Sequence, residues 1–158
     1  MVQNGHRAMP TREQLHTWRG YIETADVLRS RLGTRMQHES SLSTGDYQVL
    51  LALSEAEGRT LRASALALHI GWERSRLSHH LGRMEKRGLI GRATCADDVH
   101  GIEVSMTPEG ADSFRAGSVP HLRAVKELFL DALSADQLAQ VEDLTRTLRT
   151  HLDLEPQG

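Results

Sequence analysis

The chain has 158 residues and a formal net charge of −2, and only 4% of its residues are aromatic. Its single cysteine, Cys95, excludes an internal disulfide framework and is typical of a reducing compartment. No apolar run is long enough to cross a bilayer, and Met1 to Met9 lack the apolar stretch of a signal peptide. We therefore expect a cytoplasmic protein without a membrane partner, built as one domain over residues 1–158.

A long amphipathic helix is predicted near the N-terminus. Residues 1–10 show no periodicity and are expected to form a loose tail. Thr11 and Gln14 have the spacing of a capping box, in which each side chain bonds the other residue's backbone N–H. Apolar residues then recur at spacings of three and four from Leu15 to Met36, the period of one helix face.

The next segments have the order of a helix-turn-helix. Ser43 and Asp46 predict the start of a helix that Gly58 should close. Two short helices, Arg62 to His69 and Glu73 to Arg87, follow and are separated by a glycine turn.

A hairpin is predicted directly after this motif. Leu89 to Cys95 is expected to form a strand, and Ile102 to Met106 alternates apolar and polar residues like a half-buried strand. Aspartates and a glycine within residues 97–101 favour the turn between them. A hairpin in this place predicts a two-stranded β wing.

The C-terminal third is predicted to be helical, which makes the fold class mainly α. A cap at residues 107–109 begins one helix, which Gly117 and Pro120 should break or kink. A second capping box at residues 134–137 begins the last helix, whose apolar stripe runs to Leu152.

The end helices, residues 11–40 and 108–152, are longer than a small winged module needs for its own core. Their apolar stripes must be covered. A second copy of the chain would cover them and would suit a DNA reader with two-fold symmetry, so we expect a homodimer. A monomer whose end helices pack on each other is the alternative.

Positive charge is concentrated in the middle of the chain. Residues 59–95 carry eight basic and two acidic side chains, a net charge of +6, which leaves −8 for the rest. This asymmetry favours a segment that faces a polyanion such as double-stranded DNA. Chance clustering on a solvated surface is the alternative.

Several segments in this order resemble the MarR family of winged helix-turn-helix transcriptional regulators. The resemblance covers roughly residues 12–152. It rests on Gly45-Asp46-Tyr47, Leu66 to Gly71, Arg76-Leu77-Ser78, Arg83 to Ile90, Met106 to Gly110 and Leu133 to Leu138.

The resemblance implies a triangular dimer with two winged lobes, in which residues 43–107 form the DNA-binding lobe and the end helices form the dimerisation region. Members of this family mostly repress transcription, and many release DNA when a small, often phenolic ligand binds. Such a ligand would lie between the first helix and the lobe, which makes His16 and Trp18 candidate ligand-binding residues.

The second helix of the motif is predicted to read DNA. At about 100° per residue, Leu77, Leu81 and Met84 share one face and should pack into the lobe. The remaining surface is polar and basic, as a major-groove surface should be. The predicted DNA-binding residues are Arg62, Ser64, Arg74, Ser75, Arg76, Ser78, His79, Arg83, Lys86, Arg92 and His100.

These residues are expected to have different roles. Arg76 can bond a guanine edge with two hydrogen bonds, whereas Arg83 and Lys86, farther along the helix, are expected to bind phosphates. Arg62 and Ser64 are expected to bind phosphate near the start of the preceding helix. An ordinary solvated helix face is the alternative.

The wing departs from the family pattern. Its tip reads Asp98-Val99-His100-Gly101, where an arginine of the family commonly enters the minor groove. No lysine or arginine occurs from Ala93 to Val104. Arg92 remains a phosphate contact, and His100 would substitute only when protonated. We expect this wing to grip DNA weakly.

Other chemistry has little support. His79, His80, Cys95 and His100 are too few or too badly spaced for a structural metal site, and no cofactor or catalytic motif is present. We expect neither a metal, a cofactor nor an enzyme. Two alternatives stay open, namely a winged-helix protein with weakened DNA binding that acts through protein contacts, and a redox or metal sensor that uses Cys95.

Overall fold

The computed structural model describes residues 9–154, so the predicted tail lies outside the described part except for residues 9 and 10. Within this range the chain forms six α-helices and one antiparallel sheet of three strands. Their bounds are α1 Arg12–Glu39, α2 Thr44–Glu55, β1 Thr60–Arg62, α3 Ala63–Ile70, α4 Arg74–Lys86, β2 Ile90–Cys95, β3 Asp98–Met106, α5 Pro108–Leu128 and α6 Ala135–His151. None of the helices in these residues is apolar over a length that would span a membrane.

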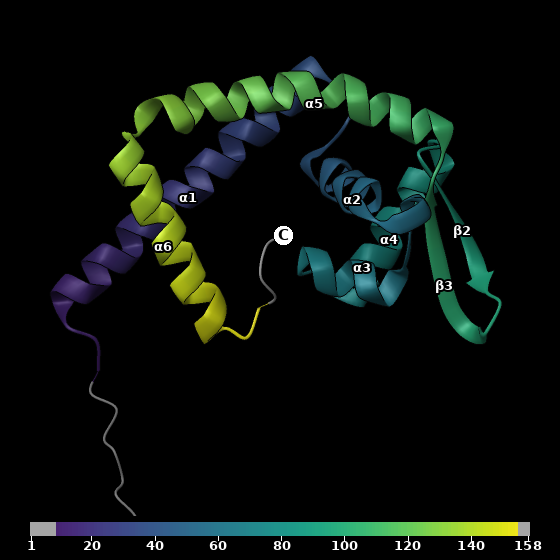
Figure 1. Cartoon of the computed structure of the whole chain (residues 1–158), viewed down its shortest axis with the longest axis horizontal. Helices are drawn as coiled ribbons and strands as arrows, with labels where there is room; N and C mark the ends of the chain where they lie inside the picture. The colour runs from purple at the N-terminus through teal and green to yellow at the C-terminus, as the bar shows by residue number, and fades with distance from the viewer. Residues whose placement is uncertain (1–8, 155–158) are drawn as a thin grey trace, which may run out of the picture.

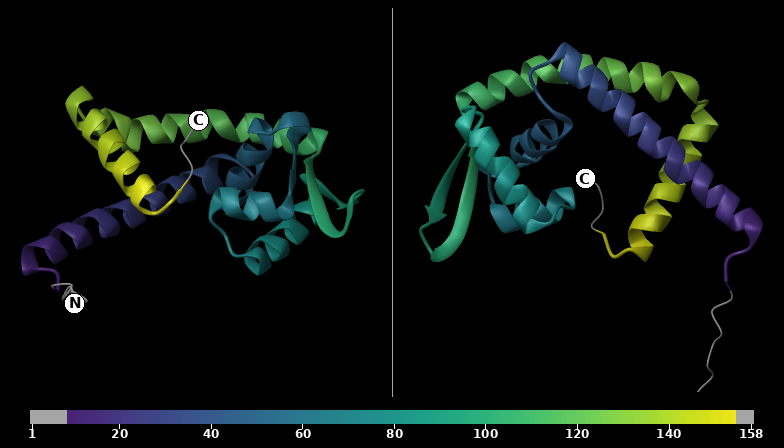
Figure 2. Two further views of the ribbon diagram at one scale, coloured as in Figure 1. Left: turned by 60° about the horizontal axis from the view of Figure 1, so that its bottom comes forward. Right: turned by 180° about the vertical axis from the view of Figure 1, so that it is seen from behind.

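The molecule has a winged lobe at one end and two long helices at the other. α5 runs along the top from the lobe to the far end, α6 descends from that end, and the N-terminal part of α1 extends away from the lobe (Figure 1). The hairpin of β2 and β3 projects at the opposite extremity from α1 (Figure 2). The lobe and the end helices are therefore joined mainly through α5 and the packed half of α1.

The core lies in the lobe. Leu77, Leu81 and Met84 on α4 are at most 1% exposed, as the helix projection predicted. They pack with the buried side chains of α2, α3 and the sheet in one continuous cluster. This burial fixes which side of α4 faces outward.

The sheet differs from the prediction because it has a third strand. β1 pairs with β3, with Leu61 opposite Val104, and the strand order is β1-β3-β2. Three residues are too few to show an alternating pattern, so sequence periodicity could not reveal this strand. The wing tip is also irregular: Cys95 pairs with Asp98 but Thr94 pairs with Ile102, which leaves residues 99–101 as a bulge.

One predicted helix end is wrong, and one predicted helix break is absent. α2 ends at Glu55, and Gly58 instead adopts a left-handed conformation inside the following 3-10 turn, with φ of 62°. α5 runs through Gly117 and Pro120 without a break. Gly117 is buried, and a Cβ there would lie 3.1 Å from Leu42, so this glycine permits close packing rather than ending the helix.

The end helices bury little of themselves. α1 has one buried residue, Met36, and α6 has none. Leu15, Trp18 and Tyr21 on α1 are about half exposed, at 47%, 58% and 50%. Large apolar surfaces of this kind are typical of protein interfaces.

We predict that Gly110→Ala destabilises the protein strongly. A Cβ at this position would lie 2.0 Å from the Leu89 carbonyl oxygen, so the backbone would have to move, at an expected loss of more than about 2 kcal/mol. Gly82→Ala is the matched control, because its Cβ would lie 3.7 Å from Arg92 and a helical alanine gains roughly 0.5–1 kcal/mol over glycine. Chemical denaturation of both variants measures the two shifts, and a Gly110 variant as stable as the Gly82 variant would contradict the packing argument.

Candidate nucleic-acid interface

The turn between α3 and α4 sets the outward face of α4. Gly71 lies between the two helices with φ of 69°, a conformation that glycine adopts without strain. The next residue, Trp72, donates its backbone N–H to the Ala67 carbonyl at 2.9 Å. α4 then begins after Glu73 and carries its apolar side into the lobe.

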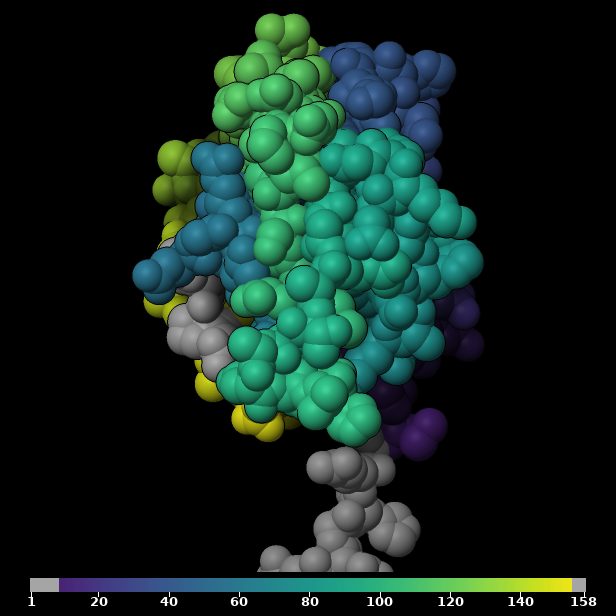
Figure 3. Space-filling model, turned by 90° about the vertical axis from the view of Figure 1, so that its right-hand side faces the viewer, coloured from purple at the N-terminus to yellow at the C-terminus, as the bar shows by residue number. Residues whose placement is uncertain are grey.

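All eleven predicted DNA-binding residues are exposed. A groove of about 430 Å³ lies between α3, α4 and the wing. Six of the eleven residues line it, namely Arg62, Ser64, Arg74, Ser78, Arg92 and His100. Figure 3 views the molecule from the end at which the wing projects. The structure thus brings these six residues together around one groove, while the other five lie exposed on α4.

Two of the predicted phosphate contacts already pair with carboxylates. Arg62 donates to both oxygens of Asp97, at 2.7 and 2.8 Å, and lies 3.6 Å from Asp98. Arg92 bonds Glu85 at 3.0 Å, and this hydrogen bond lowers the pKa of Glu85. Exposed pairs of this kind contribute at most about 1 kcal/mol, so a phosphate can displace them at small cost.

The guanidinium of Arg76 lies over an aromatic ring. Its central carbon stands 4.0 Å from the centre of the Trp72 ring, which makes a T-shaped contact with the ring of His80, with 5.2 Å between the ring centres. Arg83, two turns farther along α4, contacts Nδ1 of the same His80 at 2.9 Å. The two arginines are therefore held from below, while both remain exposed.

Sequence reasoning assigned Asp46 only a capping role and missed its contact with α4. The capping box is present, and the Ser43 N–H donates to the Asp46 carboxylate at 2.9 Å. The same carboxylate is 1% exposed and accepts a hydrogen bond from Arg87 at 2.7 Å, while Nε2 of His80 lies 3.0 Å away. Burial alone would raise the pKa of Asp46, but the contacts with His80, Ser43 and Arg87 outweigh burial and hold that pKa well below its usual value.

The candidate ligand-binding residues lie on the outer part of α1. His16 is exposed, and Trp18 is 58% exposed. An apolar cleft of about 570 Å³ lies between α1, the end of α5 and α6. On α1 its lining begins at Gly20 and Tyr21. Neither His16 nor Trp18 lines this cleft.

The residues considered for metal or redox chemistry are dispersed. His80 is buried on the inner side of α4, whereas His79 and His100 are exposed. Cys95 is 9% exposed and lies at the wing bulge, where a Cβ on Gly101 would stand 2.9 Å from its sulfur. Among residues 9–154, no group of three or more His, Cys, Asp or Glu side chains is placed to hold a metal ion.

A helix-turn-helix with a wing and an exposed basic second helix defines the class of winged helix-turn-helix DNA-binding proteins. No model of a known protein family matches the chain. The chain is 32% identical to the transcriptional regulator HosA of Escherichia coli O157:H7 over 115 residues, which cover 72% of this chain and 83% of HosA. It is 25% identical over 148 residues to the transcriptional repressor MprA of E. coli K12, covering 94% of this chain and 82% of MprA.

Solved structures agree with these relatives. Sco3205 from Streptomyces coelicolor, a MarR family transcriptional regulator crystallised in complex with DNA, superposes with a TM-score of 0.87. Its sequence is 32% identical, and the match covers 94% of this chain and 93% of that one. The chain therefore belongs to the MarR family of transcriptional regulators.

We predict that stability falls at low pH through Asp46. Because its pKa is depressed in the folded state, its stabilising contribution is present above the unfolded value of about 3.9 and is lost as the pH falls through and below it. Asp46→Asn should be less stable at neutral pH and should lose less between about pH 5 and 3 than the wild type. Denaturant titrations across this range measure the slope, and equal slopes for the two proteins would refute the assignment.

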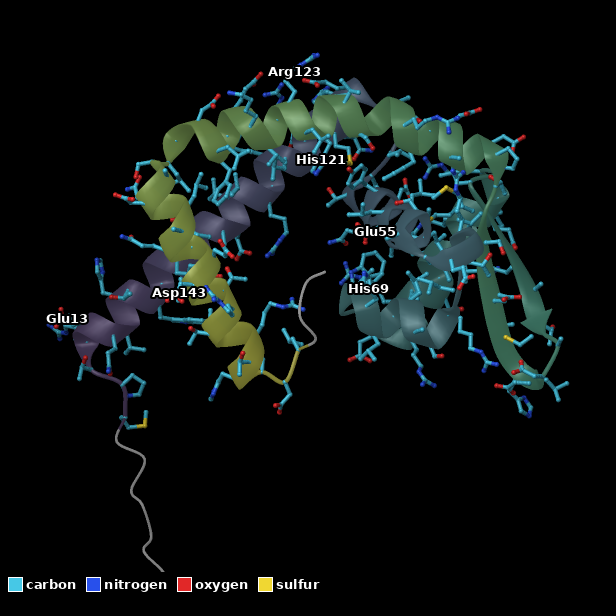
Figure 4. All side chains as sticks on the ribbon, in the orientation of Figure 1. Glu13, Glu55, His69, His121, Arg123 and Asp143 are labelled. Atoms are coloured by element: carbon cyan, nitrogen blue, oxygen red, sulfur yellow. The ribbon has the colours of Figure 1, made fainter. Side chains whose placement is uncertain are left out.

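A second group, His121, also makes the stability depend on pH, and its effect must be distinguished from that of Asp46. Burial lowers the pKa of His121, whose ring lies 4.4 Å from that of Tyr47 beneath α5 (Figure 4). Since the neutral imidazole is favoured in the fold, its contribution is lost as the pH falls below the unfolded value of about 6.5. The contribution of His121 therefore begins to fall below about pH 6.5, whereas that of Asp46 begins to fall near pH 3.9, so denaturant titrations from pH 7 downward record the onset of each.

Proposed function

We propose that the protein is a homodimeric, sequence-specific DNA-binding repressor that reads a palindromic operator with α4. The observation that carries this proposal is the exposed face of α4, where Arg76 and Arg83 are held on Trp72 and His80. The crystallised DNA complex of Sco3205, at 32% identity, supports DNA as the partner. The name of MprA, a transcriptional repressor, supports repression, and the regulatory relatives point to a protein that is not an enzyme.

The geometry of the lobe suits a duplex. α4 has 13 residues, so its exposed face can lie in the major groove while the wing lies over the neighbouring backbone. The groove between α3, α4 and the wing carries Arg62, Arg74 and Arg92, which suits phosphate oxygens. Arg76 projects a planar fork of donors, which matches the two acceptors on a guanine edge.

The end helices support a second copy as the partner. α6 buries none of its residues, and Val141, Leu144, Leu148 and Leu152 on it are 37–60% exposed. Of these, Val141 and Leu144 line the apolar cleft of about 570 Å³ together with residues of α1 and the end of α5. We therefore assign dimerisation to residues 11–40 and 108–152 and DNA binding to residues 43–107. Two lobes related by a two-fold axis would meet half-sites about one turn of DNA apart.

Release by a small phenolic ligand stays a prediction of the family resemblance. His16 and Trp18 lie on the exposed outer part of α1, so a second copy would have to complete any pocket around them. Titrating phenolic acids into the protein–DNA complex tests this part separately from DNA binding.

We predict that Arg76 and Lys86 on α4 contribute differently to DNA binding. Arg76→Ala should cost roughly 1–3 kcal/mol on the best operator and relax the choice of base, because a bidentate base contact is lost. Lys86→Ala should weaken binding to all sequences alike and make the salt dependence shallower. Both are measured by fluorescence anisotropy on an operator selected from a random pool. An Arg76→Ala protein that binds every sequence as the wild type does would contradict base reading.

The second prediction concerns the dimer. Leu144→Glu should dissociate it, because a carboxylate cannot be buried in an apolar interface without a partner. Ala139→Glu adds the same charge on the opposite side of α6, at about 100° per residue, and should leave the dimer intact. Sedimentation equilibrium gives the mass of each. A wild-type monomer at micromolar concentration, or dissociation by Ala139→Glu alone, would refute the proposed interface.

A further inference from the structure

A single buried imidazole lies beneath both arginines of the α4 surface. His80 is 8% exposed and comes four residues after Arg76 and three before Arg83, so one helix turn separates it from each. Its ring contacts Arg83 directly and Trp72 edge-on, and Arg76 lies on that same Trp72 ring. Two side chains that face outward are thus supported by one that faces inward.

The partners of His80 assign its tautomer. A guanidinium has donors and no acceptor, so the contact of 2.9 Å from Arg83 to Nδ1 requires Nδ1 to accept with its lone pair. The ring proton is then on Nε2, which is buried 3.0 Å from the carboxylate of Asp46; the two are not aligned for a hydrogen bond, so they interact through charge. The negative charge of Asp46 favours that proton, so Asp46 keeps Nδ1 free for Arg83.

The backbone of α2 clamps both rings. A Cβ on Gly45 would lie 2.9 Å from Cε1 of His80 and 2.9 Å from Cη2 of Trp72, so no larger residue fits without moving them. Asp46, the next residue, is itself held by Arg87 at the end of α4 and by the Ser43 N–H. The imidazole therefore has little freedom to rotate, and its contacts are set before any DNA arrives.

We propose that His80, held as the Nε2–H tautomer by Asp46, is a positioning residue that sets the directions of Arg83 and Arg76 and thereby sets DNA affinity without touching DNA. This inference rests on the proposed DNA-binding function. Its physical basis is preorganisation, because a long side chain already held in its bound direction loses less conformational freedom on binding.

The inference predicts coupling between His80 and Arg83. His80→Phe keeps a ring against Trp72 but removes the acceptor for Arg83, and it should weaken binding about tenfold. In an Arg83→Ala background the same change should weaken binding less than about twofold, because the contact is already absent. His80→Asn, whose amide oxygen can take the place of Nδ1, should recover most of the affinity. A role confined to general stability would give equal losses in both backgrounds and no recovery.

The experiment measures anisotropy of these variants on one duplex, selected beforehand from a random pool by the wild type, with circular dichroism as a check of folding. Nitrogen-15 chemical shifts of the His80 ring in the free protein report the tautomer independently of DNA. Wild-type binding with additive losses, or a proton on Nδ1, would overturn the positioning role alone. No wild-type binding to any duplex at low salt would overturn both this inference and the proposed function. If His80→Phe does not fold, the His80→Asn comparison and the ring shifts decide.

Discussion

A carboxylate with 1% exposure remains charged only where its surroundings replace the water it has lost. Asp46 obtains that replacement from three directions: the N–H of its own helix cap, the guanidinium of Arg87 and the imidazole of His80. Because Arg87 and His80 lie at the end and in the middle of α4, this one group ties the first turn of α2 to α4 at two points. The apolar contacts of Leu77, Leu81 and Met84 press α4 into the lobe, but such contacts have little directionality. The polar contacts fix its rotation, and hence which residues face outward.

At the far end of the molecule, by contrast, many apolar side chains of α1 and α6 are not covered by other parts of the chain. A helix of 28 residues with one buried side chain and a helix of 17 residues with none leave much apolar surface uncovered. α5 connects this region to the lobe, and Arg35 on α1 bonds Glu127 of α5. In a two-fold assembly the distance between the two α4 surfaces would depend on how α1 and α6 pack. The packing of the dimer would then determine the spacing of the half-sites that the two α4 helices can reach together.

Features that depend on residues close together in the sequence were predicted correctly, whereas contacts between residues far apart in the sequence were not. The capping boxes at Thr11, Ser43 and Ser134 formed as expected, because each depends on residues three positions apart. The inward face of α4 followed from helical periodicity in the same way. β1 was missed because a strand of three residues has no readable period, and α5 continued through Pro120 because packing against its neighbours outweighed a local breaker. The pairing of Asp46 with Arg87 joins residues 41 positions apart, and the sequence around neither residue predicts it.

The basic residues of the segment 59–95 are not all free to bind phosphate, because some of them already pair with carboxylates. Arg62, Arg87 and Arg92 are each paired with a carboxylate, and two of these three lie beside the wing or at its base. Within residues 9–154, by contrast, no carboxylate pairs with Arg74, Arg76, Arg83 or Lys86, all on α4. A phosphate near the wing must first displace Asp97 from Arg62, whereas a duplex at α4 meets cations with no competing anion. The balance of electrostatic attraction therefore favours α4 over the wing, and an acidic wing tip that binds Arg62 internally is consistent with a weak grip there.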